Sequence, residues 1–529
     1  MVEIGAAEAT EAMMPDEAGS QRNRNKMGFV ECTSYVVGNI IGSGIFITPT
    51  TILSYTQSAG LSLIVWVGCG LISLLGAICY IELGTSILEP GCDFAYTVYV
   101  GWEAIAFAFM WVSVFITYPA SAAVQALTFG QYIVNGISPA LAIGSPWHEI
   151  TERILGYSIV VILTFLNFYA IDRFAARFQV VVTTAKMLAM GIIIATGFYY
   201  LIFKGWTQNL ENMMEGSVYA PGKLTLAFYG GLWSYAGWDI LNYGTPEIEK
   251  PRRTMPLSLI SGILIVCATY VAINVSYFVV LSPAEVLNST AVAADFAQKA
   301  LGNFSYAIPF MVAILLVGTL NSNIFCGSRF MYAAARERHL PTCISCVNEA
   351  SNSPRAALLG QLICTFIVSF VHIDTLINYV TFVMWAQKVV TVVALLYLRY
   401  AKLPVAEGAI KIPIVLSVIF LVLSVVLVVV PFVEEPIVTF IGVGVVISGL
   451  VFFYALVRPA HAPVFLQRIN DCTTKFTCRL LHSRPDLKKD IPETMVNTDE
   501  VGAEAEASTR DESSGKSEEI FSPQSRHSS

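Results

Sequence analysis

Small residues interrupt an apolar stretch near its centre, at Gly42, Ser43 and Gly44. The stretch covers residues 28–54 and is long enough to cross a bilayer as a helix. Glycine costs about 1 kcal/mol relative to alanine in a helix interior, so we expect the helix to unwind here. The freed N–H groups suit a carboxylate, and freed carbonyl oxygens suit an ammonium group or a cation. The alternative is that these glycines only permit close packing of another helix.

A second apolar stretch, at residues 224–248, has the same character. Ala236 and Gly237 lie at its centre, with Trp233 and Asp239 on either side. Each of the two interrupted stretches is the first of a set of five apolar stretches. Interrupted spans at corresponding positions are typical of transporters built from inverted repeats. The pair therefore favours a binding site over accidental packing glycines.

The elements that must position these residues are membrane helices. The chain of 529 residues is 55% hydrophobic and only 13% charged, whereas soluble domains carry about 25% charged residues. This composition excludes a soluble protein, and nothing in it suggests nucleic-acid binding. Twelve apolar stretches follow one another, at 28–54, 61–85, 94–123, 154–170, 178–203, 224–248, 256–281, 304–335, 356–372, 375–398, 412–431 and 436–457.

The sequence therefore predicts an all-α polytopic membrane protein with twelve transmembrane helices. Ten would form a 5+5 inverted repeat in which helices 1 and 6 are broken, and two would be additional. Residues 27–457 form this domain, between a polar N-terminal tail (1–26) without the features of a signal peptide and a polar C-terminal tail (458–529) expected to be largely disordered. Even numbers of spans put both tails on one side, and the bias of lysine and arginine predicts that this side is the cytoplasm.

Few other residues have side chains that suggest a chemical role. Lys186 and Lys388 lie within predicted spans, where a charge is costly and normally has a role. Lys388 could pair with an acid or line a polar cavity. Cys343 and Cys346 form a CxxC pair without a second pair at zinc spacing, so we expect no metal site. We also expect no cofactor and no enzymatic activity, because the membrane region has no nucleophile–base constellation or phosphate loop.

Several motifs together resemble the light chains of L-type amino acid transporters, which belong to the amino acid–polyamine–organocation superfamily. They are IIGSGIFITPT in the first stretch, LWSYAGW in the sixth, Thr245-Pro246-Glu247, the YIELG segment at 80–84 and the RERHLP segment at 336–341. The similarity covers residues 28–457. GSGIF is shared across the superfamily, whereas its combination with the sixth stretch is more specific.

The resemblance implies a substrate site for an L-amino acid. The substrate carboxylate would meet the backbone of Gly42, Ser43 and Gly44, and its ammonium group would meet carbonyls of Ile40, Trp233 and Ala236. The side chain would point toward a pocket formed by Trp233, Ala236, Gly237 and Asp239, with the Trp233 ring as a gate above the substrate. A packing or interfacial role is the alternative for Trp233.

The resemblance also bears on selectivity. Relatives that accept cationic amino acids can carry an acid at the position of Ala236, so alanine here favours neutral substrates. Asp239 departs from the usual asparagine or apolar residue, and either contacts the substrate or caps the half-helix after the break. The first reading keeps cationic transport open. Lys186 resembles the lysine that replaces a sodium ion in the family, which implies sodium-independent transport; a snorkelling lysine is the alternative.

Partners can also be predicted. Light chains of this kind usually join a single-span glycoprotein heavy chain through a cysteine in the outer loop between spans 3 and 4. We expect this loop at residues 124–153, and no cysteine occurs from 101 to 266. A disulfide link is therefore not expected, which leaves a non-covalent complex or independence. Asn288 begins a sequon, Asn288-Ser289-Thr290, on the predicted outer side, so we expect a glycan there.

These predictions amount to an amino acid exchanger of the plasma membrane, embedded in the lipid bilayer. Two further classes remain open: a transporter-like receptor that binds an amino acid and signals, and a channel. A channel needs a continuous polar lining, which these apolar stretches do not suggest.

Overall fold

The structure is a computed structural model of the whole chain, and it describes residues 27–89, 91–141, 147–169, 172–243, 245, 248–348, 353–458 and 464–487. The predicted N-terminal tail and the C-terminal tail after residue 487 lie outside the described residues, as do Pro246 and Glu247.

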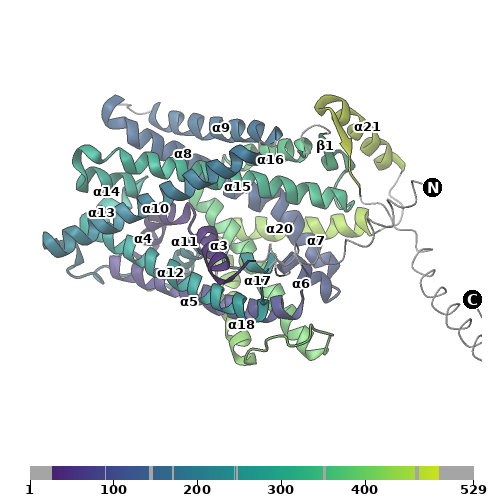
Figure 1. Cartoon of the computed structure of the whole chain (residues 1–529), viewed down its shortest axis with the longest axis horizontal. Helices are drawn as coiled ribbons and strands as arrows, with labels where there is room; N and C mark the ends of the chain where they lie inside the picture. The colour runs from purple at the N-terminus through teal and green to yellow at the C-terminus, as the bar shows by residue number, and fades with distance from the viewer. Residues whose placement is uncertain are drawn as a thin grey trace, which may run out of the picture. The chain divides into compact units, whose positions relative to one another are not determined.

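Helices account for nearly all of the described secondary structure (Figure 1). The first five predicted spans correspond to α3 (Phe29–Ile40), α4 (Gly44–Thr56), α5 (Ala59–Ser86), α6 (Asp93–Tyr99), α7 (Glu103–Val112), the π-helical turn η1 (Ser113–Thr117), α8 (Tyr118–Leu141), α9 (Trp147–Phe168) and α10 (Asp172–Phe203).

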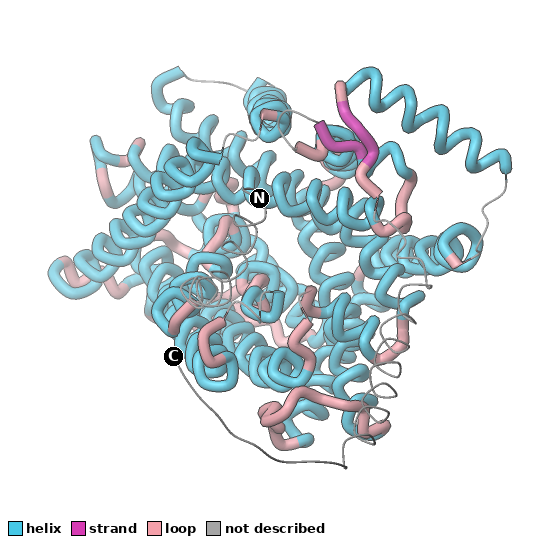
Figure 2. Tube along the Cα trace, turned by 45° about the vertical axis from the view of Figure 1, so that its right-hand side comes forward, coloured by secondary structure: helices cyan, strands magenta, loops and turns pink. Residues whose placement is uncertain are grey.

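The second half of the chain repeats this pattern of long helices and short connections. It contains η2 (Gln208–Leu210), α11 (Pro221–Ser234), η3 (Ile240–Tyr243), α12 (Pro251–Val280), α13 (Pro283–Leu287), α14 (Val292–Ala300), η5 (Gly302–Phe304), α15 (Ala307–Arg336), η6 (Thr342–Ser345), α16 (Arg355–Val368), α17 (Ile373–Tyr400), α18 (Ile414–Val429), α19 (Pro431–Glu434), α20 (Pro436–Phe452), η7 (Phe453–Val457) and α21 (Val464–Leu481). Strands β1 (Cys346–Asn348) and β2 (Ser483–Pro485) form one antiparallel pair (Figure 2).

Seven helical segments of the described residues are long and apolar enough to cross a membrane, and the bent pair α3–α4 makes an eighth if it is one span. Helix α16 and residues 439–455 are apolar but shorter. The chain is thus a predominantly helical polytopic membrane protein, as predicted, whereas the number of twelve spans stays a prediction.

In the two interrupted stretches, α4 and α11 are largely buried in the bundle, whereas one face of α3 is exposed. Helix α4 packs against α11, α3 packs against α12, and α11 also packs against α5 and α17. Buried aromatic side chains fill the spaces between these helices, among them Trp66, Tyr235 and Tyr270, whose rings meet at centroid distances of 5.0–6.2 Å. The interrupted segments are therefore held by continuous helices around them.

The structure differs from the predicted outer loop and from the half-helix considered after the second break. Helix α8 continues to Leu141 and α9 begins at Trp147, so most of the predicted outer loop 124–153 is helical. The residues after 123 are less apolar, but the helix can continue because α8 packs against α9 and α15. After the break in the sixth stretch, the described residues form a 3₁₀ turn, η3, rather than the half-helix that a cap at Asp239 presupposed.

Cys346 of the CxxC pair lies next to a cysteine that is distant in the sequence. The sulfur of Cys346 lies 3.6 Å from that of Cys478 in α21, so these two cysteines are neighbours although 132 residues separate them. Burial raises the pKa of the Cys346 thiol to about 12, which keeps the thiol protonated at neutral pH.

Candidate functional site

The break in the first stretch is a sharp bend. Helices α3 and α4 meet at 50°, with residues 41–43 between them. Ser43 precedes α4 but makes no side-chain capping hydrogen bond. The first N–H groups of a helix lack helical partners and lie at the positive end of its dipole. In α4 the Phe46 N–H donates to the Ser43 carbonyl at 3.0 Å, which leaves the N–H groups of Gly44 and Ile45 as the donors for a ligand. This is the arrangement that binds a carboxylate.

The two glycines at this bend differ in their surroundings. A side chain at Gly44 would place its Cβ 2.6 Å from the Cα of Ser234 in α11, so glycine is required there for close helix packing. At Gly42 the nearest atom to such a Cβ is the Ile40 carbonyl oxygen, at 3.8 Å, which is an ordinary contact. Close packing therefore accounts for Gly44, and only Gly42 has room beside it.

The second break faces the first. Helix α11 ends at Ser234, and residues 235–239 form a turn in which Gly237 has a φ of +91°. The Asn39 amide donates a hydrogen bond of 2.9 Å to the Gly237 carbonyl. The hydroxyl of Tyr270 lies 3.0 Å from the carbonyl oxygens of both Ile40 and Ser234. These contacts hold the end of α3 against the end of α11 and the turn that follows it.

A cavity of about 300 Å³ lies between the breaks. Seven of the predicted site residues line it: Ile40, Gly42, Ser43, Gly44, Lys186, Trp233 and Ala236. Gly237 and Asp239, predicted with them, are not among its lining residues. The lining also includes residues that the sequence interpretation missed, namely Gly38, Asn39, Ser121, Gln125, Val182, Ser234, Thr319, Ser322, Asn323 and Met384. Polar residues spaced by three or four within apolar helices, as at Ser121 and Gln125, were the signal that could have indicated them.

Lys186 lies beside the first break. Its ammonium nitrogen donates a hydrogen bond of 3.0 Å to the carbonyl oxygen of Gly38, in the last turn of α3, and only 6% of the residue is exposed. A positive charge is thus held at the carboxyl end of a half-helix, where the helix dipole favours a cation. The contact places Lys186 within the site rather than at a membrane interface, which disfavours the snorkelling alternative.

Trp233 borders the cavity on another side. It packs in an apolar cluster with Ala120, Ala123, Val124, Leu376, Ile377 and Val380, against which Ile47 also packs. Ile47 lines a second cavity of about 300 Å³, which is lined mainly by polar residues such as Thr51, Gln131 and Asp374. The apolar cluster around Trp233 therefore separates two polar cavities, which is the position that a gate would take.

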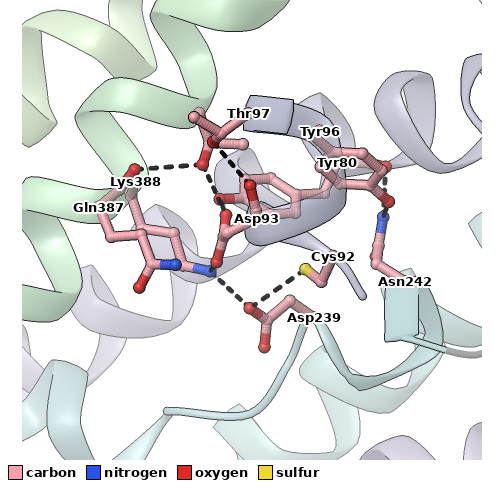
Figure 3. Close-up of polar contacts among 10 residues, drawn as sticks. Tyr80, Cys92, Asp93, Tyr96, Thr97, Asp239, Asn242, Gln387 and Lys388 are labelled. Carbon is pink, nitrogen blue, oxygen red and sulfur yellow. Dashed lines mark hydrogen bonds and ion pairs between the residues drawn. The ribbon is translucent and has the colours of Figure 1, made fainter. Parts of the chain in front are cut away.

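Asp239 belongs to a different structure, a buried charged cluster next to the cavity (Figure 3). The ammonium nitrogen of Lys388 lies 2.5 Å from Asp239 and 2.8 Å from Asp93. Neither reading of Asp239 as a substrate contact or as a helix cap included this ion pair. For Lys388, pairing with an acid was the correct one of the two alternatives.

The same cluster has the spacing of a cation site. The sulfur of Cys92 and carboxylate oxygens of Asp93 and Asp239 lie within 4.8 Å of one another. However, Lys388 already contacts both carboxylates, so its ammonium group supplies the positive charge that a metal ion would bring. These residues do not fit an additional cation without displacement of Lys388.

Comparison with known proteins agrees with this architecture. A family described as amino acid permease matches residues 27–456, which is most of the chain and includes both breaks. The chain belongs to this family. It is an integral membrane protein of the amino acid–polyamine–organocation superfamily, as the motifs at the two breaks predicted.

Relatives of the permease carry names of amino acid transporters. It is 44% identical to amino acid transporter protein 6 of Caenorhabditis elegans over 94% of each chain. It is 35% identical to the Asc-type amino acid transporter 1 of Mus musculus, over 86% of this chain and 85% of the relative. It is 34% identical to the human b(0,+)-type amino acid transporter 1, over 82% of this chain and 88% of the relative.

Proposed function

We propose that this permease is a sodium-independent transporter of L-amino acids. It would exchange neutral amino acids with large side chains and work by alternating access. The observation that carries the proposal is the uncapped start of α4, which faces the cavity beside the carbonyls of the second break. Donors for a carboxylate and acceptors for an ammonium group would thus be offered around one cavity. The names of the relatives support this class of substrate.

The charge of the cavity supports neutral substrates. Lys186 is the one charged residue among the described residues that line the cavity, and its charge is positive. Two or three charge-assisted hydrogen bonds, each about 1.5–3 kcal/mol, would hold the two charged ends of the amino acid. A cationic side chain would add a positive charge near Lys186 with no acid of the lining to balance it. The volume of about 300 Å³ suits a single small molecule.

Sodium independence is supported by the place of Lys186. Its ammonium group contacts a carbonyl of the first half-helix, where a bound sodium ion would otherwise supply charge. Because this charge is covalently part of the chain, transport would need no sodium gradient. Net movement would then follow the gradients of the amino acids themselves, as in an exchanger.

We further infer that the protein resides in the plasma membrane with both termini in the cytoplasm. Asn288 is exposed at the end of α13, which is compatible with a glycan on the outer side. A single-span glycoprotein partner would associate without a disulfide, since residues 101–266 contain no cysteine. The protein is proposed not to be an enzyme.

Flux of labelled leucine into proteoliposomes tests the proposal. We expect saturable uptake that unlabelled leucine inside the vesicles accelerates, with the same rate in sodium and choline buffers. Binding without flux would instead indicate a receptor, and flux that does not saturate would indicate a channel. Either result would overturn the proposed function.

A further inference from the structure

Two elements connect the cavity to the buried charged cluster, and on each of them the cluster residue follows a lining residue by three or four positions. On α17, Met384 lines the cavity and Lys388 follows four residues later, which is about 6 Å along the helix axis. On the second break, Ala236 lines the cavity and Asp239 follows three residues later. The ion pair between Lys388 and Asp239 therefore joins a continuous helix to the unwound segment directly beside the site (Figure 3).

Lys388 is held by Asp93 and Tyr80 outside this segment and by the Trp238 ring within it. The Lys388 ammonium group donates a hydrogen bond of 2.8 Å to Asp93, which also accepts hydrogen bonds from the hydroxyls of Tyr80 and Thr391, the latter at 2.7 Å. The ammonium nitrogen lies 4.5 Å from the ring centroid of Tyr80 and 5.1 Å from that of Trp238. Exposed fractions of 7% for Lys388, 4% for Asp93 and 8% for Asp239 show that water is nearly excluded.

The unwound segment needs such anchors. In residues 235–239 the regular helical hydrogen bonds end, so the backbone is held by fewer bonds than in α11. A backbone segment without anchors loses conformational entropy when a ligand orders it, and this loss weakens binding. Tyr270 holds Ser234 at the end of α11, and the segment itself is held at Gly237 through Asn39 and at Asp239 through Lys388.

We propose that Lys388 is a positioning residue of the substrate site and acts through Asp239. By fixing the far end of the unwound segment, the ion pair orients the backbone at Ala236, which lines the cavity, before an amino acid arrives. Asp239 then contributes to affinity without contacting the substrate. This inference rests on the proposed transport function and adds to it two residues, Asp93 and Lys388, that act from outside the cavity.

The charge balance of the cluster defines a clean variant. Two carboxylates face one ammonium group, so Asp239→Asn leaves a neutral pair of Lys388 and Asp93. Removing Lys388 instead would leave two buried carboxylates without a counter-charge, which is expected to unfold the protein. Asp239→Asn therefore replaces the ion pair to the segment by, at most, a weaker hydrogen bond to the amide oxygen, while it keeps the cluster compensated.

The experiment measures leucine uptake by the full-length chain in proteoliposomes, normalised to the amount reconstituted. Asp239→Asn is expected to raise KM about tenfold, within the range of coupling energies between contacting residues. The KM for an amino acid with a different side chain should rise by the same factor, because the ammonium and carboxylate groups are common to all substrates. Asp93→Asn keeps the tie to Asp239 and should raise KM less.

The ion pair of Glu82 and Arg399 provides a matched control. Arg399 also lies on α17, and it pairs with buried Glu82 of α5 rather than with the unwound segment. Glu82→Gln/Arg399→Met should lower the amount of folded protein but leave KM unchanged. An equal rise of KM in this control would reduce the effect to general destabilisation and overturn the inference.

Two other results would also overturn it. An unchanged KM in Asp239→Asn would show that the ion pair does not position the site, and a rise confined to cationic substrates would show direct contact with Asp239. If Asp239→Asn does not fold, the uncharged variant Asp93→Asn/Asp239→Asn/Lys388→Met gives the same comparison. Failure of the wild-type protein to move any amino acid would refute the proposed function itself, a result distinct from these.

Discussion

Replacement of Gly42 by alanine tests the carboxylate site most directly. Gly42 lines the cavity, and a Cβ added there meets nothing closer than the Ile40 carbonyl oxygen at 3.8 Å. The methyl group is therefore expected to be accommodated by the fold. It would nevertheless occupy space in which the substrate carboxylate must approach the N–H groups at the start of α4.

The size of the effect follows from the bonds at risk. Loss of one charge-assisted hydrogen bond removes about 1.5–3 kcal/mol of binding free energy. Since about 1.4 kcal/mol corresponds to a factor of ten, KM for leucine should rise by at least about tenfold in Gly42→Ala. Gly44 also lines the cavity, but Gly44→Val is less informative, because the valine side chain would collide with Ser234 and disturb the packing of α4 against α11.

The assay is initial-rate leucine uptake at several concentrations, with the amount of folded protein measured in parallel. Gly191→Ala in α10 is the matched control, because a Cβ there meets no atom within 4 Å and Gly191 is not part of the cavity lining. The control should retain the wild-type KM. A KM within twofold of wild type in Gly42→Ala would refute the placement of the carboxylate at this break.

Three further predictions concern coupling, selectivity and modification. Lys186→Ala should reduce uptake strongly while wild-type uptake stays equal in sodium and choline; a steep dependence of the wild type on sodium would contradict the role of Lys186. Ala236→Asp should raise the uptake ratio of arginine to leucine by at least about tenfold, because a charge-assisted hydrogen bond to the new carboxylate contributes more binding free energy than a neutral one. An unchanged ratio would place the side-chain pocket elsewhere. Asn288→Gln should lower the apparent mass of the protein from the cell surface, and glycosidase treatment should then cause no further shift; a mass equal to that of wild type would exclude a glycan at Asn288.

Local sequence features determined the membrane class and both breaks. Glycine at 42 and 44 and at 237 weakens a helix wherever it occurs, so the bends could be placed without knowledge of the fold. Apolar composition likewise decides between bilayer and water, because each residue contributes nearly independently to transfer. The seven predicted residues that line the cavity could be identified from the sequence for this reason, since they lie at the breaks or, like Lys186, carry a charge within a span.

Tertiary structure alone decided what the remaining residues do. Asp239 is close to the break in sequence, but its partner Lys388 is 149 residues away, and no local pattern relates them. The same holds for Gly44, whose need for glycine comes from Ser234 of another helix. The helix beyond residue 123 was missed because it is held by packing against α9 and α15 rather than by its own apolarity. Contacts between distant segments depend on how helices pack, and packing is a property of the whole bundle.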